Sequence, residues 1–212
     1  MSSDGRFIAM PHNSPLLILL SAPSGGGKTT LAQQLLQQGL ARVITCTTRA
    51  PRPGEEDGID YYFLDAETFS KRRDAGDFIE HATVYGHGYG TLRSEVLGKL
   101  REGNDILLSV DVQGAATIRQ QAKTNPELSQ ALVTVFLTPP SLAILEQRLT
   151  GRGADAPEVI RKRLGFARQE LAEWNQFQYL LISTTKAEDL RRMLAIIESE
   201  RMRVTRSRPP EL

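Results

Sequence analysis

Residues 21–30 read Ser-Ala-Pro-Ser-Gly-Gly-Gly-Lys-Thr-Thr, after the apolar run of residues 16–20 and before a helical pattern that begins at Leu31. A strand, a glycine-rich loop, Lys-Thr and a helix in this order are typical of a phosphate-binding loop. Successive glycines let backbone N–H groups face a phosphate without a Cβ in the way, and the positive end of the helix points to the same place. We therefore predict that this loop binds the phosphates of a nucleotide.

Two side chains extend this prediction, and one residue departs from the motif. Lys28 is expected to contact the β- and γ-phosphates, and the Thr29 hydroxyl is expected to bind Mg²⁺. The full motif begins with glycine where this chain has Ala22, so the backbone φ angle there is expected to be negative. The alternative is a flexible glycine turn, which the strand and helix patterns on either side make the weaker interpretation.

The composition is that of an ordinary globular domain. The 212 residues are 40% hydrophobic and 24% charged, which suffices for one sizeable core. A net charge of +1 gives no field that favours nucleic acid or a membrane surface, and no apolar run approaches the ~20 residues of a membrane span. The single cysteine, Cys46, excludes a disulfide framework, so a cytoplasmic location is expected. The composition leaves a homo-oligomer open.

Five aliphatic runs of strand length alternate with helical patterns along the chain. They are residues 16–20, 41–46, 106–110, 132–137 and 179–183. This alternation predicts an α/β fold with a five-stranded parallel core sheet and helices on both faces. Asp111 directly follows the third run, and the carboxyl ends of parallel strands are the side on which ligands bind.

Residues 47–93 depart from this pattern and are predicted to form a small mixed α+β insert. Strands are expected at residues 61–64 and 78–85, a helix capped by Asp65 at 67–75, and a glycine-rich loop at 86–91. Before them lies a loop with two prolines that carries Arg49 and Arg52. Arginine forks suit phosphate oxygens, so this loop is either an anion clamp or a solvated polar loop, and composition alone does not decide.

Residues 139–169 are predicted to form a helical lid. A helix at residues 141–149 is followed by a glycine-flanked segment and then by a longer helix, whose apolar stripe is expected to end at Trp174. The cations of this region form either a solvated helix face or a mobile arm that closes on bound phosphates and excludes water. The arm would carry Arg148, Arg152 and Arg163.

The two ends of the chain are expected to be flexible arms around one domain, residues 15–208. Residues 1–14 lack the apolar core of a secretory signal. A final helix is expected after Thr185, which forms a capping box with Glu188, and the basic tail, residues 205–212, is expected to be solvated. The core is assigned to residues 15–46, 94–138 and 170–204.

Seven segments of the chain resemble those of guanylate kinases in order and spacing. They are residues 23–29, 47–55, 60–63, 78–82, 89–91, 110–114 and 148–153. The resemblance implies the P-loop nucleoside-monophosphate-kinase fold, in which residues 47–93 are a GMP-binding insert. It also implies the reaction ATP + GMP to ADP + GDP with Mg²⁺, with dGMP as a further acceptor and with no nucleic-acid or membrane partner.

The resemblance implies a role for each matching residue. ATP would be bound by Ala22, Pro23, Ser24, Gly25, Gly26, Gly27, Lys28, Thr29 and Thr30, with Thr29 near Mg²⁺. GMP would be bound by Thr45, Arg49, Arg52, Tyr61, Glu80, Tyr89, Thr91 and Asp111. The catalytic cations would be Lys28, Arg49, Arg148, Arg152 and Arg163. Ser109 and one three-residue segment also depart from the family pattern. Ser109 stands where an aspartate is common, and residues 183–185 are Ser-Thr-Thr where Asn-Asp-Asp is common, so no adenine contact is assigned.

The residue types support these roles independently. A phosphate acceptor is already anionic at neutral pH, so the site needs many cations and no strong base. A carboxylate such as Glu80 can accept from both N1–H and the exocyclic amine of guanine, whereas adenine presents an acceptor at N1. Glu80 could instead be a surface strand residue. Two other functions stay open: a peptide-binding module without catalysis, and a P-loop kinase for another phosphorylated acceptor.

Overall fold

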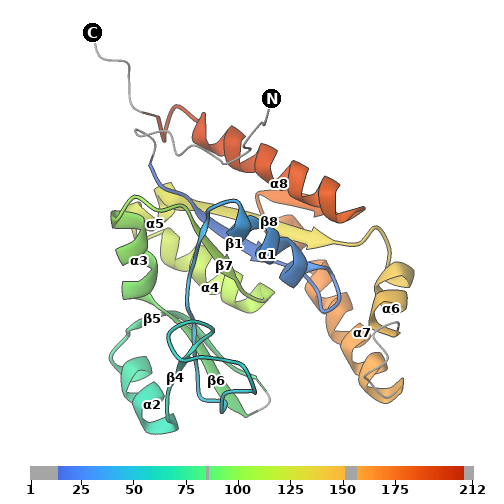
Figure 1. Cartoon of the computed structure of the whole chain (residues 1–212), viewed down its shortest axis with the longest axis horizontal. Coiled ribbons are helices and arrows are strands. Elements are labelled where there is room, and N and C mark those ends of the chain that lie inside the picture. The colour runs from blue at the N-terminus through green and yellow to red at the C-terminus, as the bar shows by residue number, and fades with distance from the viewer. Residues whose placement is uncertain (1–13, 85, 151–156, 208–212) are drawn as a thin grey trace.

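The computed structural model describes residues 14–84, 86–150 and 157–207 and arranges them around two β-sheets (Figure 1). The larger sheet has the strand order β2-β7-β1-β8-β9, and all its neighbouring strands are parallel. Its strands are β1 Leu17–Ser21, β2 Ala41–Arg42, β7 Ile106–Ser109, β8 Leu132–Thr138 and β9 Tyr179–Ile182. The predicted five-stranded parallel core sheet is therefore confirmed.

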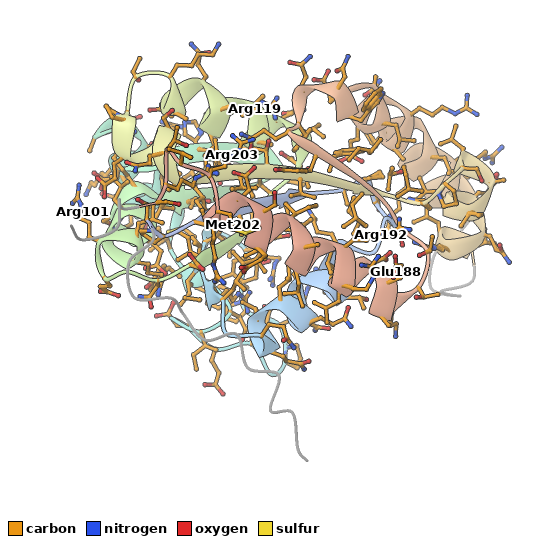
Figure 2. The ribbon with its side chains drawn as sticks, turned by 90° about the horizontal axis from the view of Figure 1, so that it is seen from above. Arg101, Arg119, Glu188, Arg192, Met202 and Arg203 are labelled. Carbon is orange, nitrogen blue, oxygen red and sulfur yellow. The ribbon has the colours of Figure 1, made fainter. Side chains whose placement is uncertain are left out.

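Helices cover both faces of this sheet, as predicted. One face packs against α1 (Lys28–Gln37) and α8 (Lys186–Arg201), and the other against α3 (Arg93–Arg101), α4 (Val112–Ala122) and α5 (Pro126–Ala131). Alternate residues of β1 enter the two apolar clusters, which explains its unbroken run of aliphatic residues. Figure 2 shows α8 lying across the sheet, with Glu188 and Arg192 near its first turns and Met202 just beyond its last residue.

The smaller sheet has the order β4-β3-β6-β5 and is built from β3 Cys46–Thr47, β4 Tyr62–Phe63, β5 Phe78–Val84 and β6 His87–Leu92. The helix α2 (Ala66–Asp74) packs Phe69 onto it, and Asp65 caps this helix by accepting from the Thr68 N–H at 2.6 Å. The small sheet expected within the insert is thus present. It hangs from the core below α3 and α4 in Figure 1.

Two predictions in this region were wrong. Residues 86–91 were expected to form a loop, but residues 87–91 belong to β6, where Gly88 and Gly90 pack closely against aromatic rings. A Cβ on either glycine would come within 2.9 Å of the ring of Phe69 or Phe78. The run 41–46 was expected as one core strand, but it is divided between β2 of the core sheet and β3 of the smaller sheet.

Cys46 therefore belongs to the smaller sheet and not to the core. It is fully buried, and burial raises the pKa of its thiol to about 11. The thiol is accordingly protonated at neutral pH, which agrees with a small packing residue.

Replacing Gly90 by alanine is expected to lower the free energy of unfolding by about 1–3 kcal/mol, because the new methyl group would collide with the buried Phe78 ring. Gly98 is a matched control, since it lies in α3 with open space around its Cβ position. Alanine there should raise the free energy of unfolding by about 0.5–1 kcal/mol. Urea unfolding of both variants measures the difference, and equal effects would contradict the close contact at Gly90.

The predicted lid region contains two helices, α6 (Leu142–Thr150) and α7 (Pro157–Ala172). They pack against each other through Leu145, Leu149 and Ala167. The apolar stripe of α7 does not reach Trp174, which is 49% exposed and begins a short 3-10 helix, η1 (Trp174–Gln176). The prediction for Trp174 was therefore wrong. Arg152 lies outside the described residues.

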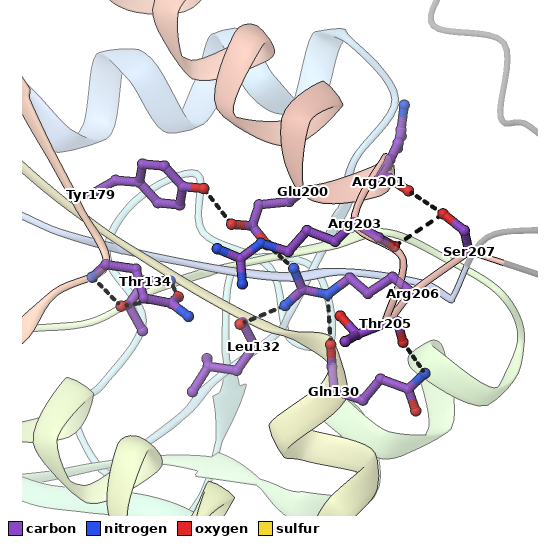
Figure 3. A network of polar contacts seen from close by, with 11 residues as sticks. Gln130, Leu132, Thr134, Tyr179, Glu200, Arg201, Arg203, Thr205, Arg206 and Ser207 are labelled. Carbon is purple, nitrogen blue, oxygen red and sulfur yellow. Dashed lines mark hydrogen bonds and ion pairs between the residues drawn. The ribbon is translucent and has the colours of Figure 1, made fainter.

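The first residues of the basic tail are docked, and the expectation of a solvated end was wrong for Arg206. This side chain is buried and forms an ion pair with the fully buried Glu200 of α8 (Figure 3). Its Nε and Nη2 donate to the carbonyl oxygens of Gln130 and Leu132 at 2.8 and 3.1 Å. Glu200 also accepts from the Tyr179 hydroxyl, so the contact joins α8 to β8 and β9. Across the described ranges, no helix is long and apolar enough to cross a membrane.

Candidate active site

The phosphate loop lies at the carboxyl end of β1 and leads directly into α1. Gly25 and Gly27 adopt φ angles of 84° and 101°, a region that disfavours any side chain. No side chain caps α1, so the first N–H groups of the helix remain available to an anion. The loop encloses a cavity of about 320 Å³, here called the loop cavity, lined by residues 22–30 and Glu170. Residues 22–30 are thus brought together as the sequence predicted.

Lys28 is held at the bottom of this region. Its Nζ donates to the carbonyl oxygen of Val110 at 2.9 Å, just after the end of β7. Burial lowers the pKa of Lys28, and the nearby carboxylates of Asp111 and Glu170 oppose that shift. The ammonium group is therefore placed at the carboxyl edge of the sheet, beside the loop.

Glu170 is a member of the site that the sequence did not reveal. It comes from α7, and its Oε2 accepts from the Ser24 N–H of the loop at 3.3 Å. Burial raises the pKa of this carboxyl group, while the Ser24 hydrogen bond and Lys28 lower it. A carboxylate thus lies where backbone N–H groups are arranged for an anion. The pair is 146 residues apart in sequence, and no local signal marks it.

A second, larger cavity of about 920 Å³, here called the wide cavity, adjoins the first. Both cavities are lined by Ser24 and Glu170. Its other walls come from the end of β5, the start of α4 and α7, and include Thr83, Asp111, Gln113, Arg163 and Phe166. Three predicted site residues, Ser24, Asp111 and Arg163, therefore line one cavity that opens beside the phosphate loop.

Glu80 and Thr91 meet at the junction of the smaller sheet and α4. Thr91 Oγ1 donates to Glu80 Oε1 at 2.5 Å, and both side chains are buried. Burial raises the pKa of Glu80, Thr91 lowers it, and Asp111 raises it further. Asp111 caps α4 by accepting from the Gly114 N–H at 2.8 Å. Thr91 occupies one oxygen of the buried Glu80 carboxylate. The second oxygen can accept a hydrogen bond from a ligand that carries N–H groups.

Gly114 fits closely against this pair, and this packing gives a prediction. A Cβ on Gly114 would lie 3.1 Å from Glu80 Oε2 and 3.2 Å from the Cβ of Val110. Replacing Gly114 by alanine is expected to push the Glu80 carboxylate aside and to raise KM for the expected acceptor, GMP, about tenfold, because small displacements of a positioning group are costly. The KM for ATP should not change. Steady-state kinetics with either substrate varied test this, and Gly98→Ala again serves as the control.

Arg49 lies in an aromatic and acidic cluster beside the smaller sheet, in the segment that joins β3 to β4. Its Nη2 donates to both oxygens of Glu55 at 3.0 and 2.9 Å, and these hydrogen bonds raise its pKa. Its guanidinium lies 5.6 Å from the ring centroid of Tyr61, and the Tyr61 and Tyr89 centroids are 6.3 Å apart. The structure thus brings three predicted residues together, and Glu55 orients the arginine fork.

Two further predicted residues, Arg52 and Thr45, form backbone hydrogen bonds in this part of the structure. The Arg52 N–H donates to Glu55 Oε2 at 2.8 Å, which places its exposed side chain at the rim of the arginine cluster. Thr45 accepts at its carbonyl from the Tyr62 N–H at 2.9 Å. Roles for the Arg52 and Thr45 side chains stay predictions.

The loop, the sheet beneath it and the adjoining cavity define a P-loop kinase with the nucleoside-monophosphate-kinase fold. The family model of guanylate kinase matches residues 14–200. A guanylate kinase of Maricaulis maris is 38% identical over 207 residues, which cover 96% of this chain and 92% of the relative. The chain therefore belongs to the guanylate kinase family.

Two further comparisons agree with this assignment. A guanylate kinase of Idiomarina loihiensis is 43% identical over 186 residues, covering 86% of this chain and 83% of the relative. The crystal structure of guanylate kinase from Anaplasma phagocytophilum superposes with a TM-score of 0.73 at 30% identity and covers 92% of this chain and 90% of that one. The similarity therefore extends through the core sheet, the smaller sheet and the region of α6 and α7.

Proposed function

We propose that this chain transfers the γ-phosphoryl group of ATP to GMP, giving ADP and GDP, and that dGMP is a second acceptor. The observation that carries the proposal is that the phosphate-loop cavity adjoins the wide cavity at Ser24 and Glu170. Two anionic ligands can thus meet across one opening. We also propose a cytoplasmic location, because the single cysteine suits a reducing compartment.

The loop cavity is the proposed site of the ATP phosphates. The backbone of residues 22–30 and the Lys28 ammonium would balance their charge. A Mg²⁺ ion fits this donor set: Thr29 is exposed and lines the loop cavity, and in the described part of the chain no group of three acidic, histidine or cysteine ligands forms a separate site. Such an ion would be held mainly by phosphates and water, with Thr29 as its protein ligand, and it would neutralise charge on the β- and γ-phosphates.

The acceptor nucleotide is proposed to bind between the smaller sheet and α4. Its phosphate would meet Arg49, with Arg52 and the hydroxyls of Tyr61 and Tyr89 around it. Its guanine would place N1–H and the exocyclic amine against Glu80. The rest of the guanine pocket would come from Thr45, Thr91 and Asp111.

In this proposal the protein catalyses the reaction by positioning the two nucleotides and by stabilising negative charge on the phosphates. The attacking phosphate oxygen is anionic at neutral pH, so no strong base is required. Lys28, Arg49 and the arginines of the lid region, Arg148, Arg152 and Arg163, would hold two polyanions in line and stabilise the charge that spreads over the transferred group. Closure of α6 and α7 would exclude water, which prevents hydrolysis of ATP.

Two other functions explain fewer of these features. A peptide-binding module would not need Lys28 placed at a phosphate loop. A P-loop kinase for another phosphorylated acceptor would not need the buried Glu80 beside Thr91 and Asp111.

The test is ADP release with ATP and Mg²⁺ and with GMP, dGMP, AMP, CMP or UMP as acceptor. We expect activity with GMP and dGMP that exceeds activity with AMP by about 10⁴-fold in kcat/KM, because a buried carboxylate facing adenine would lose its partners. Activity with none of the five would exclude the proposed reaction. A preference for AMP would instead exclude the role given to Glu80.

A further inference from the structure

Arg148 reaches from α6 to the phosphate loop and is held there by a single hydroxyl group. Its Nη1 lies 3.8 Å from the position that a Cβ on Gly27 would occupy. Nη1 and Nη2 both donate to the Oγ of Ser183, at 3.4 and 3.3 Å. Ser183 directly follows β9, so the contact joins the last turn of α6 to the carboxyl edge of the core sheet.

Ser183 is in turn held by Asp189, in the first turn of α8. Its hydroxyl donates to Asp189 Oδ2 at 2.7 Å, and both residues are buried, with 4% and 7% exposed. A hydroxyl has one proton, so the proton directed to Asp189 leaves the oxygen lone pairs to accept from Arg148. The Ser183 N–H donates to the Thr138 carbonyl at 2.7 Å, and Asp189 Oδ1 accepts from the Thr184 N–H at 2.9 Å, which fixes both residues in place.

We propose that Ser183 and Asp189 are positioning residues that hold the Arg148 guanidinium over the phosphate loop before the ATP phosphates bind. The inference rests on the proposed function, because it assigns Arg148 to the transferred phosphoryl group. Neither Ser183 nor Asp189 is assigned a contact with a substrate. They act through Arg148.

The geometry suits this task for a physical reason. Arginine is a long, flexible side chain, and fixing it in advance removes an entropic cost from the reaction itself. Ser183 engages two of the five guanidinium N–H groups, which leaves three for phosphate oxygens. The distances of 3.3 and 3.4 Å from Arg148 to Ser183 Oγ are long for hydrogen bonds. These weak bonds can lengthen or break when phosphates attract the arginine. The negative charge of Asp189 acts on Arg148 indirectly, because it polarises the Ser183 hydroxyl that accepts from Arg148.

The test is a double-mutant cycle with the full-length chain, ATP and GMP. Ser183→Ala is expected to lower kcat about tenfold and to leave KM for GMP unchanged, because only the placement of Arg148 is lost. In an Arg148→Ala background the same substitution should cause no further loss, since its effect requires the guanidinium. Ser183→Thr, which keeps the hydroxyl, should restore most of the activity. Asp189→Asn should lower kcat by about as much as Ser183→Ala does.

Thr185→Ala is the matched control for a purely structural effect. Thr185 caps the same helix, α8, through the Glu188 N–H at 3.2 Å, so its loss should lower the melting temperature without lowering kcat. The inference is overturned if Ser183→Ala keeps the wild-type kcat. It is also overturned if the double variant loses the product of the two single fold decreases in kcat. In both cases the proposed function stands. A wild-type chain that phosphorylates no nucleotide would overturn both.

Discussion

Replacing Lys28 by methionine is expected to lower kcat by at least about 10³-fold while GMP binding stays largely intact. The Lys28 ammonium is the cation placed at the bottom of the phosphate-loop region, where it donates to the Val110 carbonyl. Burial lowers the pKa of Lys28, and water screens a buried charge less than an exposed one. Methionine has a similar length and no charge, so it fills the space and removes the attraction for the phosphates.

Two measurements separate this loss from misfolding. Calorimetric titration should give a GMP dissociation constant within about threefold of wild type, because the Arg49 cluster and Glu80 lie in and beside the smaller sheet, away from Lys28 in α1. The control variant is Lys71→Met on α2, where an exposed lysine pairs with Glu67. Ion pairs between exposed side chains contribute little to stability, so Lys71→Met should have the stability and the turnover of the wild type. Near-normal turnover of Lys28→Met would contradict the assignment of the loop.

The parts of the fold that could be predicted are those set by local sequence. Residues 16–31 specify β1, the loop and α1 because each signal is adjacent to the next: an aliphatic run, glycines at positive φ and a helical period. The caps of α2 and α8 by Asp65 and Thr185 are equally local, and both occur as predicted. Ala22, which stands where the motif has glycine, is buried in the core cluster beside the loop.

The features that could not be predicted depend on segments far apart in the chain. Gly88 and Gly90 suggest a loop by their type, but the rings of Phe69 and Phe78 make a flat strand of them. The contact of Glu170 with Ser24 spans 146 residues, and that of Ser183 with Arg148 spans 35. A pattern of period 2 or 3.6 carries no information about such pairs, so tertiary packing alone reveals them.

Replacing Glu80 by glutamine is expected to lower kcat/KM for GMP by about 10²-fold, or about 2.7 kcal/mol, while KM for ATP is unchanged. Thr91 occupies one carboxylate oxygen, and the other lies close to Gly114. Glutamine offers a single acceptor and places an amide N–H against the donors of guanine. The same amide matches adenine, which presents an acceptor and a donor, so kcat/KM for AMP should rise.

The pH dependence gives a second readout for Glu80. Burial raises the pKa of this carboxyl group, so it takes up a proton at a higher pH than an ordinary glutamate. Protonation removes an acceptor, and kcat/KM for GMP should therefore fall as the pH drops through that raised pKa. Glutamine does not titrate, so the Glu80→Gln variant should lack this acid limb. An exposed residue, Glu67, supplies the control Glu67→Gln, which should keep the wild-type profile. Equal losses for ATP and GMP, or an unchanged acid limb in Glu80→Gln, would show that the carboxylate does not face the guanine.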